Sequence, residues 1–487
     1  MPAQPPLTPS ASSAAAAAQR RAAAGLVPVL PLLTDLGKRF AAAGHELALV
    51  GGSVRDALLG RADLASADLD LATDAPPERV LELLADWADT TWEAGIRFGT
   101  VGVRRGDRRL EITTYRTERY DPDSRKPSVA YGDTLAGDLA RRDFTVNALA
   151  VTLPDLAFVD LHGGLADLAA GVLRTPGAPE DSFGDDPLRM LRAARFTAQL
   201  GFDLDPAAVT AITAMADRLA IVSAERVRDE FSRLLLSAEP RRGLGLLVDT
   251  GLSAQVLPEL AGLRLEIDEH HRHKDVYEHT LIVLEQAMDL ETAGPDLVLR
   301  LAALLHDIGK PRTRRFSGDG RVSFHHHEVV GARMTTKRLQ ALRYPNDIVE
   351  AVSTLVELHL RFHGYGTGAW TDSAVRRYVR DAGPLLGRLH QLTRADCTTR
   401  NRRKALALQR AYDELEARIE TLGEAEELAA IRPDLDGNAI MAVLGIPPGR
   451  EVGEAYRFLL ELRLDQGPLG EEAAADALRQ WWAQRQG

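Results

Sequence analysis

The chain has 487 residues, a length that predicts two to four domains at roughly 100–200 residues each. Apolar residues make up 45% and charged residues 26%, values that exclude a largely disordered chain. The single cysteine, Cys397, excludes an intrachain disulfide and a cysteine-rich zinc site, so we expect a cytoplasmic protein. A formal charge of −11 excludes a uniformly basic surface but leaves room for a local basic groove, and no apolar run is long enough to span a membrane.

Hydrophobic periodicity divides the chain into an α/β part and a helical part. The Ala-, Pro- and Ser-rich start, residues 1–25, predicts a disordered leader. From there to residue 175, helical patterns alternate with β-like runs at 47–50, 100–103 and 110–115, which predicts a mixed sheet with helices. After Pro176 apolar residues recur at helical spacing in nearly all that follows, beginning with 186–200, 206–219 and 224–236, so we expect the rest to be helical.

The segment Leu49-Val50-Gly51-Gly52-Ser53-Val54-Arg55-Asp56 predicts a strand that turns into a helix at two glycines. Such a turn exposes backbone N–H groups at the positive end of a helix, where a phosphate can bind. Arg55, one helical turn further on, can add guanidinium donors. A tight turn without a ligand explains the same glycines, so the motif depends on its neighbours for a functional interpretation.

Asp68 and Asp70 stand two residues apart in a β-like segment, so their carboxylates project from the same face. Two such carboxylates repel each other unless a cation lies between them, and Mg²⁺ prefers one or two carboxylates together with phosphate oxygens. Glu111, in the run 110–115, is a candidate for a third carboxylate. The set predicts magnesium-dependent nucleotidyl transfer, and a solvated strand end is the alternative.

Two further motifs combine acidic residues with closely spaced arginines. They are Arg141-Arg142-Asp143-Phe144-Thr145-Val146-Asn147-Ala148 and Asp185-Asp186-Pro187-Leu188-Arg189, and the second continues with Arg192 and Arg195 at three-residue spacing along a helix. Together with the two earlier motifs and Ala224-Glu225-Arg226-Val227-Arg228-Asp229-Glu230, they resemble, in this order, the bacterial CCA-adding tRNA nucleotidyltransferase and poly(A) polymerase family. The resemblance covers residues 26–260, with Asp185 standing where the family usually has Glu.

The resemblance implies that Asp186 and Arg189 act as an amino-acid template for the incoming base. A carboxylate accepts a hydrogen bond from the exocyclic amine of C or A, and a guanidinium donates to the adjacent ring nitrogen. U and G present the opposite pattern and would leave buried polar groups unpaired, at about 1–3 kcal/mol each. The resemblance also implies nucleotide binding by Gly51, Gly52, Arg55, Arg142, Asp143, Asn147, Arg192 and Arg195.

Most of the 13 histidines lie between His270 and His363, which predicts a metal centre in the helical half. Mixed histidine and aspartate ligands suit Mn, Fe, Co, Ni or Zn and are tolerated by Mg. The chain contains, in order, Tyr277-Glu278-His279, Leu305-His306-Asp307-Ile308-Gly309-Lys310, Phe324-His325-His326-His327-Glu328, Leu358-His359 and Ala395-Asp396. This order resembles an HD-type metal phosphohydrolase domain. The resemblance implies His279, His306, Asp307 and Asp396 as ligands, with His327 and His359 as candidates for a second ion or for phosphate. We expect His270, His271, His273, His325 and His326 at the surface, and the basic runs 310–315 and 400–404 either bind RNA phosphate or are solvated.

The motifs together predict a nucleotidyltransferase head at 26–175, a helical neck that binds nucleotide and RNA at 176–265, an HD domain at 266–405 and a helical tail at 406–487. The expected function is template-independent addition of CCA to tRNA 3′ ends from CTP and ATP, with Mg²⁺ in the head and a divalent ion in the HD domain. A poly(A) polymerase, or an enzyme adding only CC or only A, shares these motifs and stays an alternative. A remote alternative is an HD phosphohydrolase with an RNA-binding head. The oligomeric state is left open.

Overall fold

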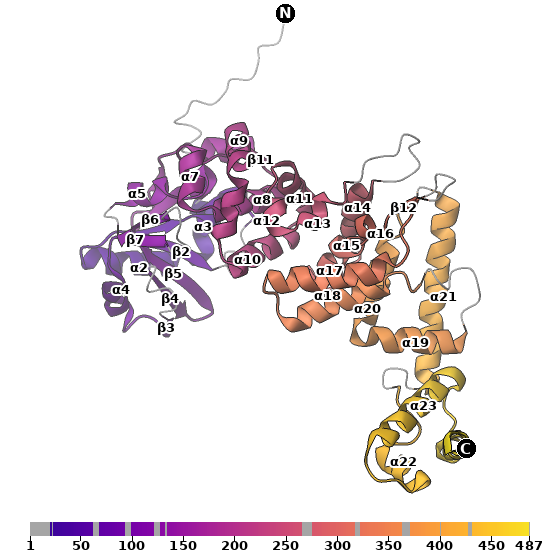
Figure 1. The fold of residues 1–487 in the computed structure, drawn as a ribbon. Coiled ribbons are helices and arrows are strands. Elements are labelled where there is room, and N and C mark those ends of the chain that lie inside the picture. The colour runs from indigo at the N-terminus through magenta and orange to yellow at the C-terminus, as the bar shows by residue number, and fades with distance from the viewer. Residues whose placement is uncertain are drawn as a thin grey trace, which may run out of the picture. The chain divides into compact units, whose positions relative to one another are not determined.

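The computed structural model describes residues 20–61 except 22, 68–92, 99–120, 127–131, 134–264, 275–316, 322–362, 371–399, 401–426 and 431–486. The chain divides into two compact units, Met1–Pro258 and Glu259–Gly487, and we describe each unit by itself (Figure 1). No helix in these described ranges combines the length and the apolar character needed to cross a bilayer.

The first unit is built on a mixed sheet of seven strands in the order β3-β4-β5-β2-β1-β8-β9. Strands β2 and β5 are parallel, and the other neighbours in this sheet are antiparallel. A separate antiparallel pair is formed by β6 (Arg116–Tyr120) and β7 (Pro127–Tyr131). The strands of the large sheet are β1 (Leu47–Val50), β2 (Leu69–Thr73), β3 (Thr90–Trp92), β4 (Thr100–Arg105), β5 (Arg108–Thr114), β8 (Leu149–Leu153) and β9 (Phe158–Asp160).

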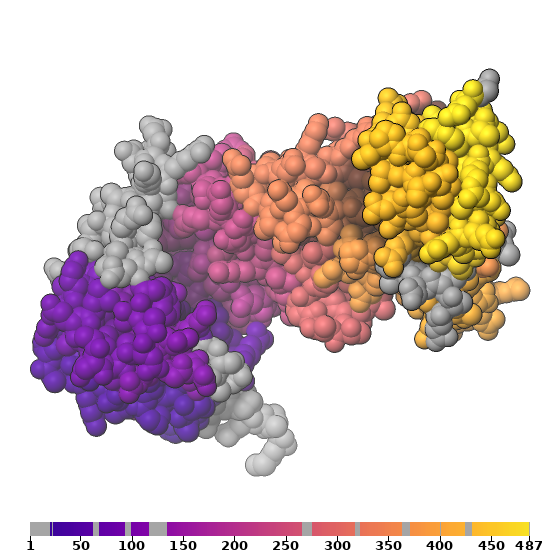
Figure 2. Space-filling view, turned by 90° about the horizontal axis from the view of Figure 1, so that it is seen from below, coloured from indigo at the N-terminus to yellow at the C-terminus, as the bar shows by residue number. Residues whose placement is uncertain are grey.

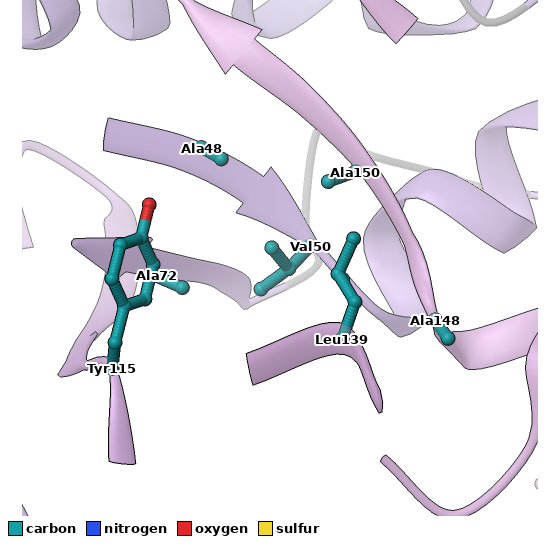
Figure 3. Packing of buried hydrophobic residues seen from close by; sticks show 7 residues of the cluster. All are labelled: Ala48, Val50, Ala72, Tyr115, Leu139, Ala148 and Ala150. Carbon is teal, nitrogen blue, oxygen red and sulfur yellow. The ribbon is translucent and has the colours of Figure 1, made fainter. Parts of the chain in front are cut away.

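Both faces of the sheet centre are covered, which explains why β1 is buried at all four positions. On one face, Ala48 and Val50 pack with Tyr115 and with Leu139 of the short helix α5 (Leu135–Ala140), as Figure 3 shows. On the other face lies α2 (Leu30–Ala42), where Gly37 lies so close to Leu153 of β8 that a Cβ there would be 2.6 Å from the leucine Cβ. Ala72 of β2 belongs to this cluster beneath α5. Asp70 stands two residues earlier in the same strand, so its side chain projects from the same face of the sheet.

Helices continue the first unit after the sheet. The helix predicted over 206–219 is α9 followed by a 3-10 helix, and the one predicted over 186–200 begins at Leu188 because Pro187 precedes it. The helical elements of this unit are η1 (Val27–Val29), α2, α3 (Gly52–Leu59), α4 (Pro77–Leu84), α5, η3 (Thr145–Asn147), α6 (Gly164–Ala170), α7 (Pro179–Asp185), α8 (Leu188–Leu200), α9 (Pro206–Met215), η4 (Ala216–Ile221), α10 (Ala224–Leu235), α11 (Pro240–Asp249) and α12 (Ser253–Val256), and α13 (Pro258–Ala261) follows.

Two sequence-based expectations need correction. Residues 23–25 belong to a helix that continues to the buried Leu26, whereas we expected a disordered leader to extend through residue 25; residues 1–19 lie outside the described chain. Alanine favours helix, and Gly25 packs against the backbone of Ala57. The region after Pro176 also contains strands, namely β11 (Asp203–Leu204), which pairs with β10 (Val172–Leu173), and the β12–β13 pair (Arg315–Phe316 with Val322–Ser323). Each of these strands is two residues long, which is too short for an alternation of apolar and polar residues to be recognised in the sequence.

Where the structure describes it, the second unit is helical apart from the β12–β13 pair. Its last three helices form a cluster of their own, coloured yellow in Figure 2, around the buried Ile440, Leu459 and Leu478. The helical elements are α14 (Val276–Asp289), α15 (Leu297–Leu305), α16 (Lys310–Thr313), α17 (His327–Ala341), α18 (Asn346–Leu358), α19 (Asp372–Ala382), η5 (Gly383–Leu385), α20 (Leu386–Ala395), α21 (Arg402–Glu426), α22 (Gly437–Leu444), α23 (Arg450–Gln466) and α24 (Glu471–Gln486).

Candidate active site and candidate metal centre

Three carboxylates, those of Asp68, Asp70 and Glu111, lie on the sheet face that carries α5, beyond the part that this helix covers. Asp70 of β2 and Glu111 of β5 are Cα partners across the parallel strands, and Asp68 immediately precedes β2. All three side chains are exposed to solvent. The hydroxyl of Ser53 ties α3 to this edge, because it donates to the Asp68 carbonyl (3.4 Å) and accepts from the Asp70 N–H (3.5 Å).

This carboxylate cluster is electrostatically unfavourable without a cation. Although Asp70 is exposed at the cavity, the protein packed around its carboxylate removes part of its hydration and raises its pKa; the charges of Glu111 and Asp68 add to the rise, and Arg142 opposes it. A set of oxygen ligands that repel one another at an open edge matches what Mg²⁺ requires. The donor chemistry of these residues therefore fits a magnesium ion, although in the described residues the three carboxylates do not form a close ligand group of the kind seen in the second unit.

Gly51, the first of the two glycines after β1, allows an arginine to approach the start of α3. Gly51 has a φ of +71°, and a Cβ at this position would lie 2.8 Å from Nη1 of Arg142. Arg55 does not join Arg142 at this surface. It is 4% exposed, donates from Nη1 to Oδ1 of Asn147 (2.5 Å) and pairs with Asp56.

A cavity of about 460 Å³ lies beside the carboxylates. Asp70 and Arg142 line it, together with four more of the residues predicted to bind nucleotide: Asp143, Asp186, Arg189 and Arg192. The remaining predicted residues, Gly51, Gly52, Arg55, Asn147 and Arg195, are not among its lining residues. The lining also includes residues that sequence reasoning did not assign to the site: Arg141, Arg226, Asp229, Glu230 and Arg233. Three of these belong to the 224–230 motif, so the motif itself was the signal that could have identified them.

A chain of charged contacts joins the loop between α5 and η3 to the helices α8 and α10. Arg192 donates from Nη2 to Asp143 (2.6 Å) and from Nη1 to Glu230 (3.2 Å), and Glu230 also accepts from Arg195 (2.6 Å). Burial alone would raise the pKa of Asp143, but the charge of Arg192 and the hydrogen bonds from Asn147 and Arg192 hold it below its usual value. Burial lowers the pKa of Arg195 to about 10, still far above neutral, so the guanidinium is charged. The network orders one wall of the cavity.

Asp186 and Arg189 are both held in place at the cavity. Asp186 accepts from Nη2 of Arg226 (3.1 Å) and from the Leu188 N–H (3.1 Å). Arg189 donates to the Ser182 hydroxyl (3.0 Å) and to the Arg141 carbonyl (2.5 Å). Contacts of this kind restrict the rotamers of the two side chains, as a fixed hydrogen-bonding template requires.

The second unit brings six of the predicted metal-binding side chains into one centre. They form two adjacent groups, His279 with His306 and Asp396, and Asp307 with His327 and His359. Asp307 lies between the groups, with Oδ2 3.2 Å from Nε2 of His306 and Oδ1 3.2 Å from Nε2 of His327. His306, His327 and His359 stand at helix ends, and each donates from Nδ1 to a backbone carbonyl, which leaves Nε2 as the atom facing the centre.

The buried ring nitrogens indicate that this centre fits a metal. Nε2 of His359 is buried and has no hydrogen-bond partner among the described residues, Nε2 of His327 is buried and faces only the Asp307 carboxylate there, and Nε2 of His306 lies 3.4 Å from Nε2 of His279. Burial lowers the pKa of His359 to about 4, so its imidazole is neutral and can donate a lone pair. His325 and His326 are exposed as expected, whereas His270, His271, His273 and part of the 400–404 run lie outside the described residues.

A mixed sheet that presents clustered carboxylates beside an arginine-rich cavity, followed by a helical unit with a His/Asp centre, defines a nucleotidyltransferase with an HD domain. The family model of the "Poly A polymerase head domain" matches residues 47–174, that of the "Probable RNA and SrmB- binding site of polymerase A" matches 201–263, and that of the "HD domain" matches 276–401. The chain belongs to the bacterial CCA-adding tRNA nucleotidyltransferase and poly(A) polymerase family, in the form that carries a C-terminal HD domain.

Individual relatives agree with this assignment. An A-adding tRNA nucleotidyltransferase of Deinococcus radiodurans is 37% identical over 445 residues, which cover 90% of this chain and 95% of the relative. A CC-adding tRNA nucleotidyltransferase of Thermus thermophilus is 35% identical, with 89% and 93% covered. The solved CCA-adding enzyme of Bacillus stearothermophilus in complex with CTP is 25% identical and superimposes with a TM-score of 0.66 over 95% of this chain and 98% of that one.

Proposed function

We propose that this protein completes the CCA sequence at tRNA 3′ ends, adding C, C and A from CTP and ATP in the cytoplasm. The observation that carries the proposal is the placement of Asp186 and Arg189 in the same cavity as Asp70. A base-reading pair and a catalytic carboxylate within one cavity are what a polymerase without a nucleic-acid template needs. Solved relatives are described as complexes with CTP, with ATP and with tRNA, which supports this choice of substrates.

The residues divide the chemistry among them. Asp68, Asp70 and Glu111 would hold Mg²⁺, which lowers the pKa of an attacking hydroxyl and stabilises a departing pyrophosphate. Arg142 and Arg192 bind the triphosphate, and Asp186 and Arg189 orient C or A by its Watson–Crick edge. The tRNA 3′ oxygen then forms a bond to the α-phosphorus as the bond to pyrophosphate breaks.

A second candidate is addition of only A or only CC. It is favoured by two relatives that match this chain along nearly their whole length, because one is named A-adding and the other CC-adding. The match to a CCA-adding enzyme of Lacticaseibacillus paracasei is 45% identical but covers 54% of that enzyme. Full-length similarity therefore favours partial addition, and identity within the matched half favours full addition.

Three tRNA acceptors separate these candidates: one that lacks CCA, one that ends in C and one that ends in CC. Each is incubated with CTP, ATP or both, and the products are sequenced. Completion of all three with both nucleotides supports the proposal. Extension of only the CC-ending acceptor identifies an A-adding enzyme, extension that stops at CC identifies a CC-adding enzyme, and a long A tail identifies a poly(A) polymerase.

We further propose that the HD domain is a metal-dependent phosphohydrolase acting on phosphomonoesters or cyclic phosphates. The two adjacent groups of possible metal ligands carry this proposal, together with Nε2 of His359, a buried ring nitrogen that has no hydrogen-bond partner among the described residues. The test is hydrolysis of p-nitrophenyl phosphate and of 2′,3′-cyclic nucleotides with Mn²⁺, Ni²⁺, Co²⁺, Zn²⁺ or Mg²⁺ added singly. The division into head, neck, HD domain and tail at the boundaries predicted above belongs to the same proposal.

A further inference from the structure

A second cavity, of about 410 Å³, adjoins the carboxylate cluster in the first unit. Asp68 and Glu111 line it, whereas Asp70 lines the first cavity, so the three carboxylates are divided between the two cavities. In an in-line displacement the attacking and leaving oxygens lie on opposite sides of the phosphorus. If the nucleotide occupies the arginine-rich cavity, the second cavity is open to the attacking substrate.

The floor of this cavity is an aromatic platform fitted to a glycine. Trp92, Gly102, Glu111 and Asp70 are successive Cα partners across β3, β4, β5 and β2, so their side chains share one face of the sheet. A Cβ on Gly102 would lie 2.0 Å from the Trp92 ring, which shows that the indole lies directly on the glycine backbone. Trp92 is therefore fixed beside Glu111 while it remains partly exposed to the cavity.

Two cations stand in the next cross-strand row. Arg104 and Arg109 are Cα partners on β4 and β5, both are exposed, and both line the cavity. Among the residues that the structure describes, neither arginine has a carboxylate partner. A fixed aromatic ring beside exposed guanidinium groups is the arrangement that binds single-stranded nucleic acid, with the ring stacking on a base and the cations contacting phosphate.

We propose that this cavity receives the 3′-terminal nucleotide of the acceptor RNA, with its base stacked on Trp92 and its phosphodiester beside Arg104 and Arg109. This placement delivers the terminal 3′-hydroxyl to the side of the carboxylate cluster formed by Asp68 and Glu111. The proposal rests on the proposed function, because it assigns the second substrate of the same reaction.

The experiment compares a normal acceptor with one whose terminal nucleotide lacks its base, each paired with the nucleotide that the wild-type protein adds. With the normal acceptor, Trp92→Ala raises the acceptor KM about 5- to 100-fold, and Trp92→Phe restores most of the loss. With the abasic acceptor, wild type and Trp92→Ala differ by less than about twofold, because the stacking interaction is already missing. Nucleotide Kd, measured without RNA, stays unchanged and confirms that the head is folded.

The arginines have a separate readout. Arg104→Ala with Arg109→Ala weakens acceptor binding and reduces the slope of log K against log salt by about 0.7 for each phosphate that is no longer neutralised. Arg79→Ala, an exposed head arginine on α4 paired with Glu82, is the matched control and leaves the slope unchanged. Weaker nucleotide binding with an unchanged acceptor KM, or equal Trp92→Ala effects on both acceptors, overturns the site assignment. Failure of wild type to extend any acceptor instead overturns the proposed function.

Discussion

Asp70 and Glu111 are direct Cα partners across the parallel strands β2 and β5, so two carboxylates meet on one face of the sheet. Because Asp70 has a raised pKa, its ionised form destabilises the folded head when no cation is present. We expect Asp70→Asn to lower nucleotide addition by at least about 10²-fold, since a ligand for the catalytic ion is removed.

The same substitution has an opposite effect on stability. A folded-state pKa above the unfolded value costs stability at neutral pH, so Asp70→Asn in EDTA should melt at the same temperature as wild type or higher. Asp107→Asn, in the exposed turn between β4 and β5, is the control and should retain activity. Near wild-type incorporation by Asp70→Asn would contradict the catalytic assignment.

Asp186→Ala and Arg189→Ala should lose discrimination between nucleotides before they lose triphosphate binding. Each removes one hydrogen-bonding partner of the base edge, so the ratio of UTP or GTP to CTP or ATP incorporation should rise about 10-fold or more. Arg233 lines the same cavity, so Arg233→Ala serves as a control, which should weaken the binding of all nucleotides equally. Unchanged incorporation ratios in the Asp186 and Arg189 variants would show that these side chains bind the phosphates.

Asp143→Asn should loosen the helix α8, because it removes the carboxylate charge that pairs with Arg192 at 2.6 Å. The expected loss is about 2–3 kcal/mol in the local opening free energy of α8, measured by hydrogen exchange. Since the folded pKa of Asp143 is depressed, its stabilisation is complete above its unfolded pKa of about 3.9 and is lost as the pH falls toward the folded value.

The difference between Asp143→Asn and wild type should therefore be full at pH 7 and shrink below about pH 4. The control is Asp203→Asn, which removes an ion pair between Arg242 and an aspartate that is 85% exposed. It should change the local opening free energy of α8 by less than about 0.5 kcal/mol. A pH-independent difference would mean that the pair contributes through packing alone.

Asp307→Ala should remove metal from both groups of the HD centre, because its two oxygens face a histidine of each group. We expect metal content, measured by mass spectrometry after dialysis, and any phosphohydrolase activity to fall to background, whereas nucleotide addition at saturating tRNA largely survives. His306→Ala combined with Asp307→Ala should behave in the same way.

His326→Ala is the matched control for the HD centre, since its imidazole is 83% exposed and it precedes His327 in the chain. It should keep the metal. A large fall in nucleotide addition by Asp307→Ala, with the helical unit still folded, would show that the two activities are coupled.

Local sequence patterns were enough to predict the order of motifs and the mixed sheet with a helical continuation. These features depend on residues close together in the chain, where strand alternation and helical spacing act directly. The ordered motifs also identified the family through their resemblance to it, and that resemblance pointed to six histidines and aspartates of the HD centre before any geometry was known.

Contacts between distant segments could be established only from the three-dimensional fold. The parallel register of β2 and β5 places Glu111 opposite Asp70, and the packing of α10 on α8 brings Glu230 and Arg226 to the cavity. Arg55, which the sequence offers as a phosphate ligand, is instead buried against Asn147, 92 residues away. The fit of Trp92 over Gly102 likewise follows from strand pairing, because such contacts depend on register and packing, which local periodicity does not encode.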